Sequence, residues 1–136
     1  MATIVFCEDD PTIQKLIGIA MRSTPHRIFI ASDGALGLEM IQREQPDLVC
    51  TDLSMPVLDG FQLMDALRAD AAFTDVPVIL LTASAQRTTL DEGRRRGAVM
   101  VLSKPIGMAD LRAQVESVLA GLLSPALDRS PALDSQ

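Results

Sequence analysis

The chain has 136 residues, of which 48% are apolar and 22% are charged, and its formal net charge is −6. This length is enough for one domain with a hydrophobic core, and the negative charge argues against direct binding of nucleic acid. No apolar run approaches the roughly 20 residues that a membrane span needs, and the N-terminus lacks the pattern of a secretion signal. We therefore expect a cytoplasmic protein without a membrane partner.

The first predicted strand is Thr3–Cys7, and the acidic run Glu8-Asp9-Asp10 follows it directly. Asp10 is the expected N-cap of the first helix, with Pro11 in the first turn, where the missing N–H of proline costs nothing. Apolar residues then recur at helical spacing. They predict a core-facing stripe formed by Ile13, Leu16, Ile17, Ala20 and Met21.

The second predicted strand is Arg27–Ala31, and the single histidine, His26, precedes it at an expected surface position. One histidine excludes a multi-histidine metal centre within the chain. The next helix starts near Asp33-Gly34 and stops before Gln45-Pro46, because the residue before a proline disfavours helix. Its predicted core residues are Ala35, Leu38 and Ile41.

The third predicted strand, Leu48–Thr51, is followed by Asp52, and the fourth, Val78–Leu81, is followed by Thr82. The helix between them begins after Asp59-Gly60, and its core residues are Phe61, Met64 and Leu67.

The fourth helix, residues 86–96, is weakly predicted, because it has few apolar residues and contains Gly93. The fifth strand, Val99–Leu102, leads into Ser103-Lys104-Pro105. The fifth helix covers residues 108–122, with an apolar stripe formed by Leu111, Val115, Val118 and Leu122.

This alternation predicts an α/β fold of the doubly wound (βα)5 type, with a five-stranded parallel sheet in the order 2-1-3-4-5. The domain would span residues 1–122. Residues 123–136, which contain Ser-Pro-Ala-Leu-Asp twice, are expected to be a mobile tail or the start of a linker.

The carboxyl ends of parallel strands meet at one edge of a sheet, where ligands bind in this class of fold. Glu8, Asp9, Asp52 and Lys104 all follow predicted strands and would lie together at this edge. Carboxylates repel one another at short range, and a divalent cation such as Mg2+ is the usual reason for such a cluster.

The two cysteines, Cys7 and Cys50, lie inside apolar runs, which is typical of buried side chains. A disulfide between neighbouring strands is the alternative, although a reducing cytosol disfavours it. The spacing of cysteine and histidine does not predict a zinc site.

Four motifs at the ends of predicted strands resemble the receiver domain of two-component response regulators. The resemblance covers about residues 2–122, and its motifs are Val5–Pro11, Pro46–Pro56 continuing to Asp59-Gly60, Pro77–Ala83 and Ser103–Pro105. It implies a flavodoxin-like fold and a phosphorylation-dependent switch in a phosphorelay. It does not imply an enzyme that acts on other substrates.

By this resemblance, Asp52 would accept a phosphoryl group from a sensor histidine kinase or a histidine phosphotransfer protein. Thr82 would donate its hydroxyl to a phosphoryl oxygen, and the Lys104 ammonium would bind another. The peptide bond between Lys104 and Pro105 would be cis. The implied ligands of Mg2+ are Glu8, Asp9, Asp52 and the backbone carbonyl of Ser54.

One position departs from the family pattern. Receivers usually carry an aromatic residue three positions before the lysine, and here that residue is Val101. A moving ring therefore cannot report phosphorylation. The face of the fourth helix, fifth strand and fifth helix is still expected to change, and to mediate any homodimer or partner contact. Arg94-Arg95-Arg96 on this face is either a solvated helix end or a patch for an acidic partner.

The sequence leaves three alternative functions open. A phosphohydrolase of the haloacid dehalogenase type also uses an aspartate nucleophile with magnesium, but it needs a second acid two residues on, where this chain has Ser54. A flavodoxin-like cofactor binder would need a phosphate-binding loop and aromatic residues. A degenerate receiver would act by protein binding alone.

Overall fold

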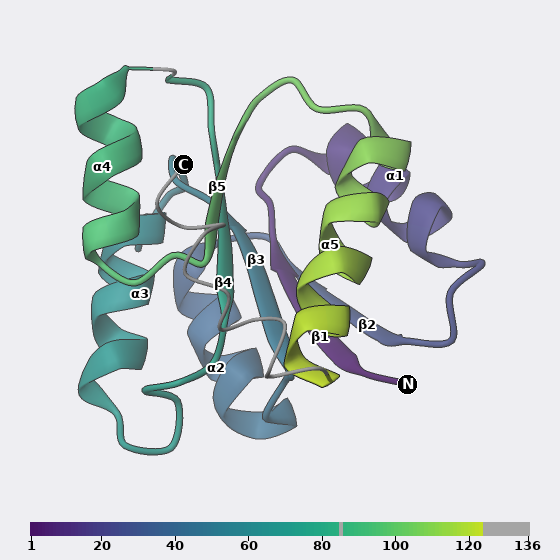
Figure 1. Cartoon of the computed structure of the whole chain (residues 1–136), viewed down its shortest axis with the longest axis horizontal. Helices are drawn as coiled ribbons and strands as arrows, with labels where there is room; N and C mark the ends of the chain where they lie inside the picture. Colours follow the sequence, from purple (N-terminus) through teal and green to yellow (C-terminus); the bar gives the residue numbers. More distant parts are fainter. Residues whose placement is uncertain (85, 124–136) are drawn as a thin grey trace.

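The computed structural model describes residues 1–84 and 86–123. Strands and helices alternate along them as β1 (Thr3–Cys7), α1 (Pro11–Met21), β2 (Arg27–Ala31), α2 (Gly34–Glu44), β3 (Leu48–Asp52), α3 (Gly60–Ala69), β4 (Val78–Thr82), α4 (Arg87–Arg95), β5 (Met100–Ser103) and α5 (Met108–Leu123). The strands form one parallel sheet in the order β2-β1-β3-β4-β5, which confirms the predicted topology (Figure 1). The tail predicted for 123–136 lies outside the described residues, apart from Leu123.

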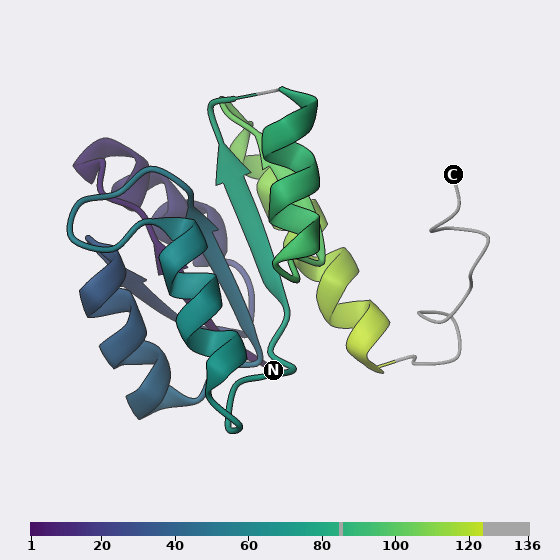
Figure 2. The same cartoon turned by 90° about the vertical axis from the view of Figure 1, so that its left-hand side faces the viewer.

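Helices cover both faces of the sheet (Figures 1 and 2). Ile4 and Phe6 of β1 belong to the core beneath α1 and α5, whereas Val5 and Cys7 belong to the core beneath α2 and α3. This alternation follows from the pleat of a strand, which points successive side chains to opposite faces. No helix in the described part of the chain is long and apolar enough to cross a membrane.

The two cysteines point to opposite faces of the sheet. Cys7 is opposite Thr51 and Cys50 is opposite Phe6 in the parallel pair of β1 and β3, and the two thiols belong to different core clusters. This geometry rules out a disulfide between them. Both side chains are buried, as predicted. Burial raises the pKa of the Cys7 thiol to about 12, so this thiol is unreactive at neutral pH.

The predicted starts of the first three helices are confirmed by their aspartate caps, but two predicted core residues in the first two helices are wrong. Asp10 accepts hydrogen bonds from the N–H groups of Thr12 and Ile13, at 2.8 and 3.4 Å. Leu16 is nevertheless 43% exposed, and Ala35 of α2 is also exposed. In α2 the contact with the sheet is made by Gly37 instead, because a Cβ there would lie 2.4 Å from the Cys7 sulfur. The prediction from helical spacing counted only residues with apolar side chains, so it did not include this glycine.

A glycine also allows α4 to pack closely against the sheet. Gly93 is buried, and a Cβ there would lie 3.0 Å from both Leu80 Cδ2 and Val101 Cγ2. The residue that weakened the helix prediction is thus the one that allows α4 to approach β4 and β5. The fifth strand starts one residue later than predicted, because Val99 is 51% exposed and Met100 pairs with Ile79.

His26 is not the surface residue that the sequence predicts. Its side chain is only 9% exposed, its Nδ1 accepts the Ala2 N–H at 3.0 Å, and its Nε2 lies 3.0 Å from Glu116 Oε1. Because Nδ1 is an acceptor, Nε2 carries the proton and donates to Glu116. The imidazole therefore joins the start of β1 to α5, a role that depends on residues far apart in the sequence.

Arg68 ties three segments together by hydrogen bonds to backbone carbonyls. Its guanidinium donates to the carbonyls of Thr74 and Val76, each at 2.8 Å, and of Gly97 at 3.0 Å. These contacts join the end of α3, the connection to β4 and the turn after α4. The planar fork of arginine suits this set of acceptors, which a lysine ammonium would reach only in part.

Replacing Arg68 by alanine is expected to lower the free energy of unfolding by about 2 kcal/mol, because three backbone carbonyls, one of them partly buried, lose their donors. Urea denaturation followed by circular dichroism measures this change. Arg43→Ala is the matched control: Arg43 is exposed and, among the described residues, bonds only to the adjacent Glu44, so a change within about 0.5 kcal/mol is expected. Equal losses in the two variants would contradict the role of Arg68.

Candidate functional site

The polar side chains predicted to meet do lie at one edge of the sheet. Cys7 is opposite Thr51 in the pair of β1 and β3, so the next residues of the two strands, Glu8 and Asp52, lie at the same level. Thr82 closes β4 and is paired with Ser103 of β5, which Lys104 follows. The parallel strands therefore bring these side chains together at the carboxyl-terminal edge of the sheet.

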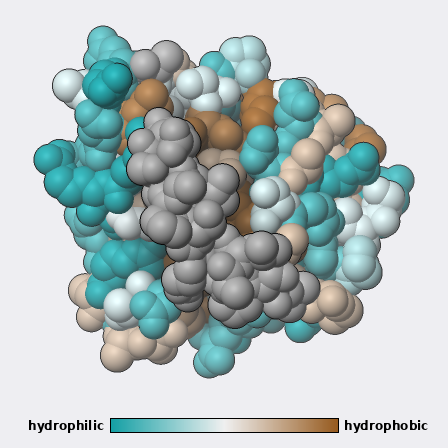
Figure 3. Space-filling view, in the orientation of Figure 1, coloured by the Kyte–Doolittle hydropathy of each residue, from teal (hydrophilic) through white to brown (hydrophobic). Residues whose placement is uncertain are grey.

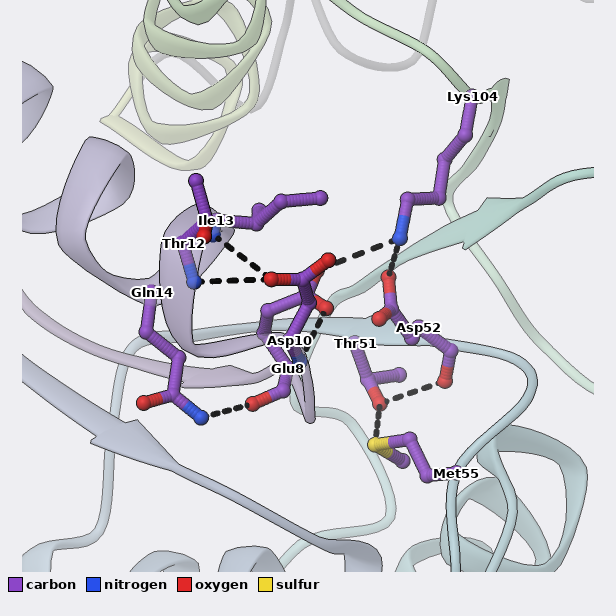
Figure 4. A network of polar contacts seen from close by, with 9 residues as sticks. All are labelled: Glu8, Asp10, Thr12, Ile13, Gln14, Thr51, Asp52, Met55 and Lys104. Carbon is purple, nitrogen blue, oxygen red and sulfur yellow. Dashed lines mark hydrogen bonds and ion pairs between the residues drawn. The ribbon is translucent and has the colours of Figure 1, made fainter.

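Lys104 lies between two buried carboxylates. Its Nζ donates to Asp52 Oδ1 at 3.1 Å and to Glu8 Oε1 at 3.3 Å (Figure 4). Asp52 is 3% exposed and Glu8 is 1% exposed. The other Glu8 oxygen, Oε2, accepts the backbone N–H of Asp10 at 3.0 Å. The ammonium thus compensates part of the charge that burial of two acids places in the core.

A third carboxylate completes an acidic group. Glu8, Asp9 and Asp52 each offer an oxygen, and these oxygens lie within 4.8 Å of one another. Three carboxylates beside one ammonium leave the site negative. An all-oxygen donor set at this spacing fits a hard divalent cation such as Mg2+. Ser54, the fourth predicted ligand through its carbonyl, is exposed in the loop after β3.

The pKa of Asp52 is raised to about 7, first by burial and then by a hydrogen bond to Glu8 and the negative charge of Glu8, which together outweigh the opposing effect of Lys104. For Lys104, burial by itself lowers the pKa. The hydrogen bond and charge of Asp52, followed by those of Glu8, outweigh it and raise the pKa of the ammonium. The site therefore holds Asp52 in an electrostatically costly position that a bound cation would relieve.

Metal-free Asp52→Asn is expected to be more stable than the wild type at pH 8, by about 1–3 kcal/mol. The folded pKa of Asp52 lies above its ordinary value of 3.8. The protonated Asp52 carboxyl therefore stabilises the folded state fully below about pH 4, and this stabilisation is lost as the pH rises through about 7. The difference between the two proteins should vanish at low pH and grow up to neutral pH. Urea titrations in a chelator at several pH values measure it, and a difference independent of pH would contradict the account.

Two supporting residues were not predicted. Gln14 of α1 donates from Nε2 to the Glu8 carbonyl at 2.7 Å, and the Thr51 hydroxyl donates to the Asp52 carbonyl at 2.9 Å (Figure 4). Both hold the backbone of an acidic residue in place. Gln14 looks like an ordinary polar helix position, and Thr51 like the end of a strand, so the sequence carried no signal for either role.

Thr82 is buried at the end of β4, and its Oγ1 accepts the N–H of Ser84 at 3.0 Å. Because the oxygen accepts this bond, the hydroxyl proton stays available for a further acceptor. The Lys104–Pro105 peptide bond is cis, as predicted.

A cavity of about 370 Å³ opens beside Lys104 between α1 and α5. Its lining is mostly apolar and includes the partly exposed Leu16 together with Ile106 and Met108. On the face seen in Figure 3, hydrophobic residues reach the surface in patches between hydrophilic ones. The polar site is thus bordered by apolar surface.

Known proteins share both the sequence pattern and the fold. The model of the response regulator receiver domain matches residues 4–116. The chain is 35% identical to protein PilH of Pseudomonas aeruginosa over 121 residues, which cover 89% of this chain and 100% of PilH. It is 34% identical to the DNA-binding dual master transcriptional regulator RpaA of Synechocystis, covering 88% of this chain and 49% of RpaA.

A solved structure agrees with these matches. The chemotaxis response regulator CheY4 of Vibrio cholerae superposes with a TM-score of 0.81 at 25% identity, covering 87% of this chain and 98% of CheY4. The chain spans all of PilH but about half of RpaA. The chain belongs to the response regulator receiver domain family, whose members serve phosphorylation-dependent signalling in two-component systems.

Proposed function

We propose that Asp52 accepts a phosphoryl group from a phosphohistidine of a sensor histidine kinase or a histidine phosphotransfer protein. The observation that carries this proposal is the buried Asp52 carboxylate, which lies within a group of three acids and 3.1 Å from Lys104 Nζ. A carboxylate that was buried for structural reasons alone would be expected to have its charge fully compensated by a cation, or to be replaced by an apolar residue. Here its burial and its acidic neighbours raise its pKa instead.

The transfer conserves atoms and charge. A carboxylate oxygen of Asp52 forms a bond to phosphorus while the P–N bond of phosphohistidine breaks, and the imidazole leaves with the electron pair and takes up a proton. Glu8, Asp9, Asp52 and the Ser54 carbonyl would hold Mg2+, which supplies positive charge next to the phosphoryl oxygens. Lys104 exchanges its bond to Asp52 for one to a phosphoryl oxygen, and the free Thr82 hydroxyl proton is donated to another.

The residues favour a switch over the alternative phosphohydrolase. A haloacid-dehalogenase-type enzyme needs a second acid two residues after the nucleophile, and that position is Ser54. The only reactions required of this chain are phosphoryl transfer to its own aspartate and the later hydrolysis of that acyl phosphate. The phosphorylated state then differs from the free state on the face formed by α4, β5 and α5.

Any homodimer or partner contact is proposed for this same α4–β5–α5 face. Val99 is exposed there, and Arg94 and Arg95 are exposed but paired within α4 with Asp91 and Glu92. Arg96 is turned inward, toward α3. The arginine run therefore offers less free positive charge to an acidic partner than its sequence indicates.

The test is to incubate the protein with Mg2+ and phosphoramidate, a small donor with a P–N bond. We expect one phosphoryl group per chain, sensitive to hydroxylamine as an acyl phosphate is, and located on Asp52 by peptide mass spectrometry. We also expect negligible hydrolysis of phosphate esters. Sustained turnover of such esters, or label on another residue, would contradict the proposal.

A further inference from the structure

A second cavity lies at the other edge of the sheet, away from the acidic site. It has a volume of about 280 Å³ and lies between the start of β1 and the end of α5. Figure 1 shows that β1 starts, and α5 ends, at the edge of the sheet opposite to the one at which β1 leads into α1. The cavity is lined by apolar and acidic residues and one histidine: Met1, Ala2, His26, Asp47, Glu116, Leu119 and Ala120. None of the residues of the proposed phosphorylation site lines it.

The polar side of this cavity is acidic. Asp47 is exposed, and its Oδ2 accepts the Thr3 N–H at 2.8 Å, so the other carboxylate oxygen can accept a further donor. Glu116 is 43% exposed and accepts from His26, whose ring is neutral because its Nδ1 accepts the Ala2 N–H. In the described part of the chain, no lysine or arginine side chain lines the cavity. It therefore fits a segment that combines an apolar side chain with a cation.

The sequence supplies such a segment directly after the cavity. Helix α5 ends at Leu123. Ser-Pro-Ala-Leu-Asp follows at 124–128, and the next residue, Arg129, is the only basic residue of 124–136. The motif recurs at 130–134, but there the next residue is Ser135. The first copy alone thus joins a leucine to a nearby cation.

The spacing within the first copy suits an acidic, partly apolar cavity. Side chains of an extended segment point alternately to its two sides, so Leu127 and Arg129 would share one side and Asp128 would point away from the cavity. The length is also sufficient. Arg129 is six residues beyond Leu123, a span of about 20 Å when extended. Glu116 precedes Leu123 by seven residues, about 10 Å along the helix, so the segment can turn and reach it.

We propose that residues 125–129 fold back along α5 and dock in this cavity. Leu127 packs against Leu119 and Ala120, and the Arg129 guanidinium pairs with the Asp47 carboxylate. The occupant of the cavity is thus the chain's own C-terminal segment, and docking fixes the direction in which the chain leaves the domain. This inference goes beyond the proposed function and does not depend on a phosphoryl group at the opposite edge of the sheet.

An arginine-specific protease tests the docking on the full chain, with release of peptide 130–136 followed by mass spectrometry. Cleavage after Arg129 tracks the fraction of molecules in which the segment is undocked. Ala120→Lys places a cation at the cavity, where it pairs with Glu116 one turn away and repels Arg129. We expect it to speed the cleavage by about five-fold, because the contacts of Leu127 and Arg129 are lost together.

Ala113→Lys is the matched control for Ala120→Lys. Both alanines are exposed on α5, and Ala113 is not among the residues that line the cavity. The added lysine is also near Glu116 in both variants, and the sequence around the cleaved bond is the same. Ala113→Lys should therefore be cleaved at the wild-type rate. Equal rates of cleavage in the two variants would overturn the proposal.

NMR identifies which copy of the motif docks. We expect nuclear Overhauser effects from the Leu127 methyl groups to the Ala120 methyl group, and none from Leu133. Leu127→Ala should shift the amide signals of Ala2 and Ala120, whereas Leu133→Ala should leave them in place. Shifts caused by Leu133→Ala alone, or by neither variant, would contradict docking of the first copy.

The same protease assay separates docking within one chain from exchange of tails between chains. Docking within a chain protects the bond after Arg129 equally at all protein concentrations. Protection that grows with concentration would place the tail of a second copy in the cavity and would overturn the proposal. The assay contains no phosphoryl donor, so its outcome is independent of whether Asp52 accepts a phosphoryl group.

Discussion

Replacing Asp52 by asparagine is expected to reduce phosphoryl uptake from phosphoramidate or a histidine kinase by at least about 1,000-fold. The amide is a poor nucleophile and cannot form a stable acyl phosphate. It also removes one of the three carboxylates that lie within 4.8 Å of one another. Radiolabel or mass-spectrometric time courses on the purified protein give the rate.

Asp59→Asn is the control for this experiment. Asp59 caps α3 by accepting the Gln62 N–H at 2.8 Å, and asparagine is as good an N-cap as aspartate. Uptake should therefore stay close to that of the wild type. Label that accumulates in Asp52→Asn at the rate seen in the control would show that another residue is the acceptor.

Replacing Lys104 by methionine is expected to destabilise the metal-free protein by about 2–4 kcal/mol at pH 8, because two buried carboxylates lose their shared cation. The loss should be smaller at pH 5. Without the ammonium, the pKa of Asp52 rises further above about 7, so at pH 5 the carboxyl is protonated in the folded protein and repels Glu8 little. Urea denaturation in a chelator at both pH values measures the two losses.

Lys15, the one other lysine of the chain, provides the comparison for Lys104. It is exposed on α1, so Lys15→Met is expected to change stability by less than about 0.5 kcal/mol at either pH. If Lys104→Met cost no more than Lys15→Met, the ammonium would not compensate the buried acids in the way that the contacts indicate.

The sequence was sufficient to predict the features of this protein that depend on the order of its strands and helices along the chain. Runs such as Leu48–Thr51, apolar on successive residues, predicted parallel strands covered on both faces. The rule for doubly wound sheets then placed Glu8 and Asp52 at one edge, and the structure brings them within reach of Lys104. These inferences need only local pattern and a general rule of topology.

What could not be predicted depends on tertiary contacts. His26 is polar and precedes a strand, yet its environment is formed by Ala2 and Glu116, which lie far from it in the sequence. Gly37 is the point of closest approach of α2 to Cys7, which lies beneath it. Helix propensity alone predicts that a glycine inside a helix lowers the stability of that helix. Only the packing shows that the absence of a side chain is required there.

The most direct test of the account is a titration of the full chain with Mg2+ and beryllium trifluoride, followed by NMR, for the wild type and Asp52→Asn. We predict magnesium-dependent, saturable shifts at Asp52, Thr82 and Lys104 in the wild type, and none in the variant. Saturable binding that proceeds without Mg2+, or that Asp52→Asn leaves unaltered, would contradict the claim that these side chains form one site for a metal and a phosphoryl group.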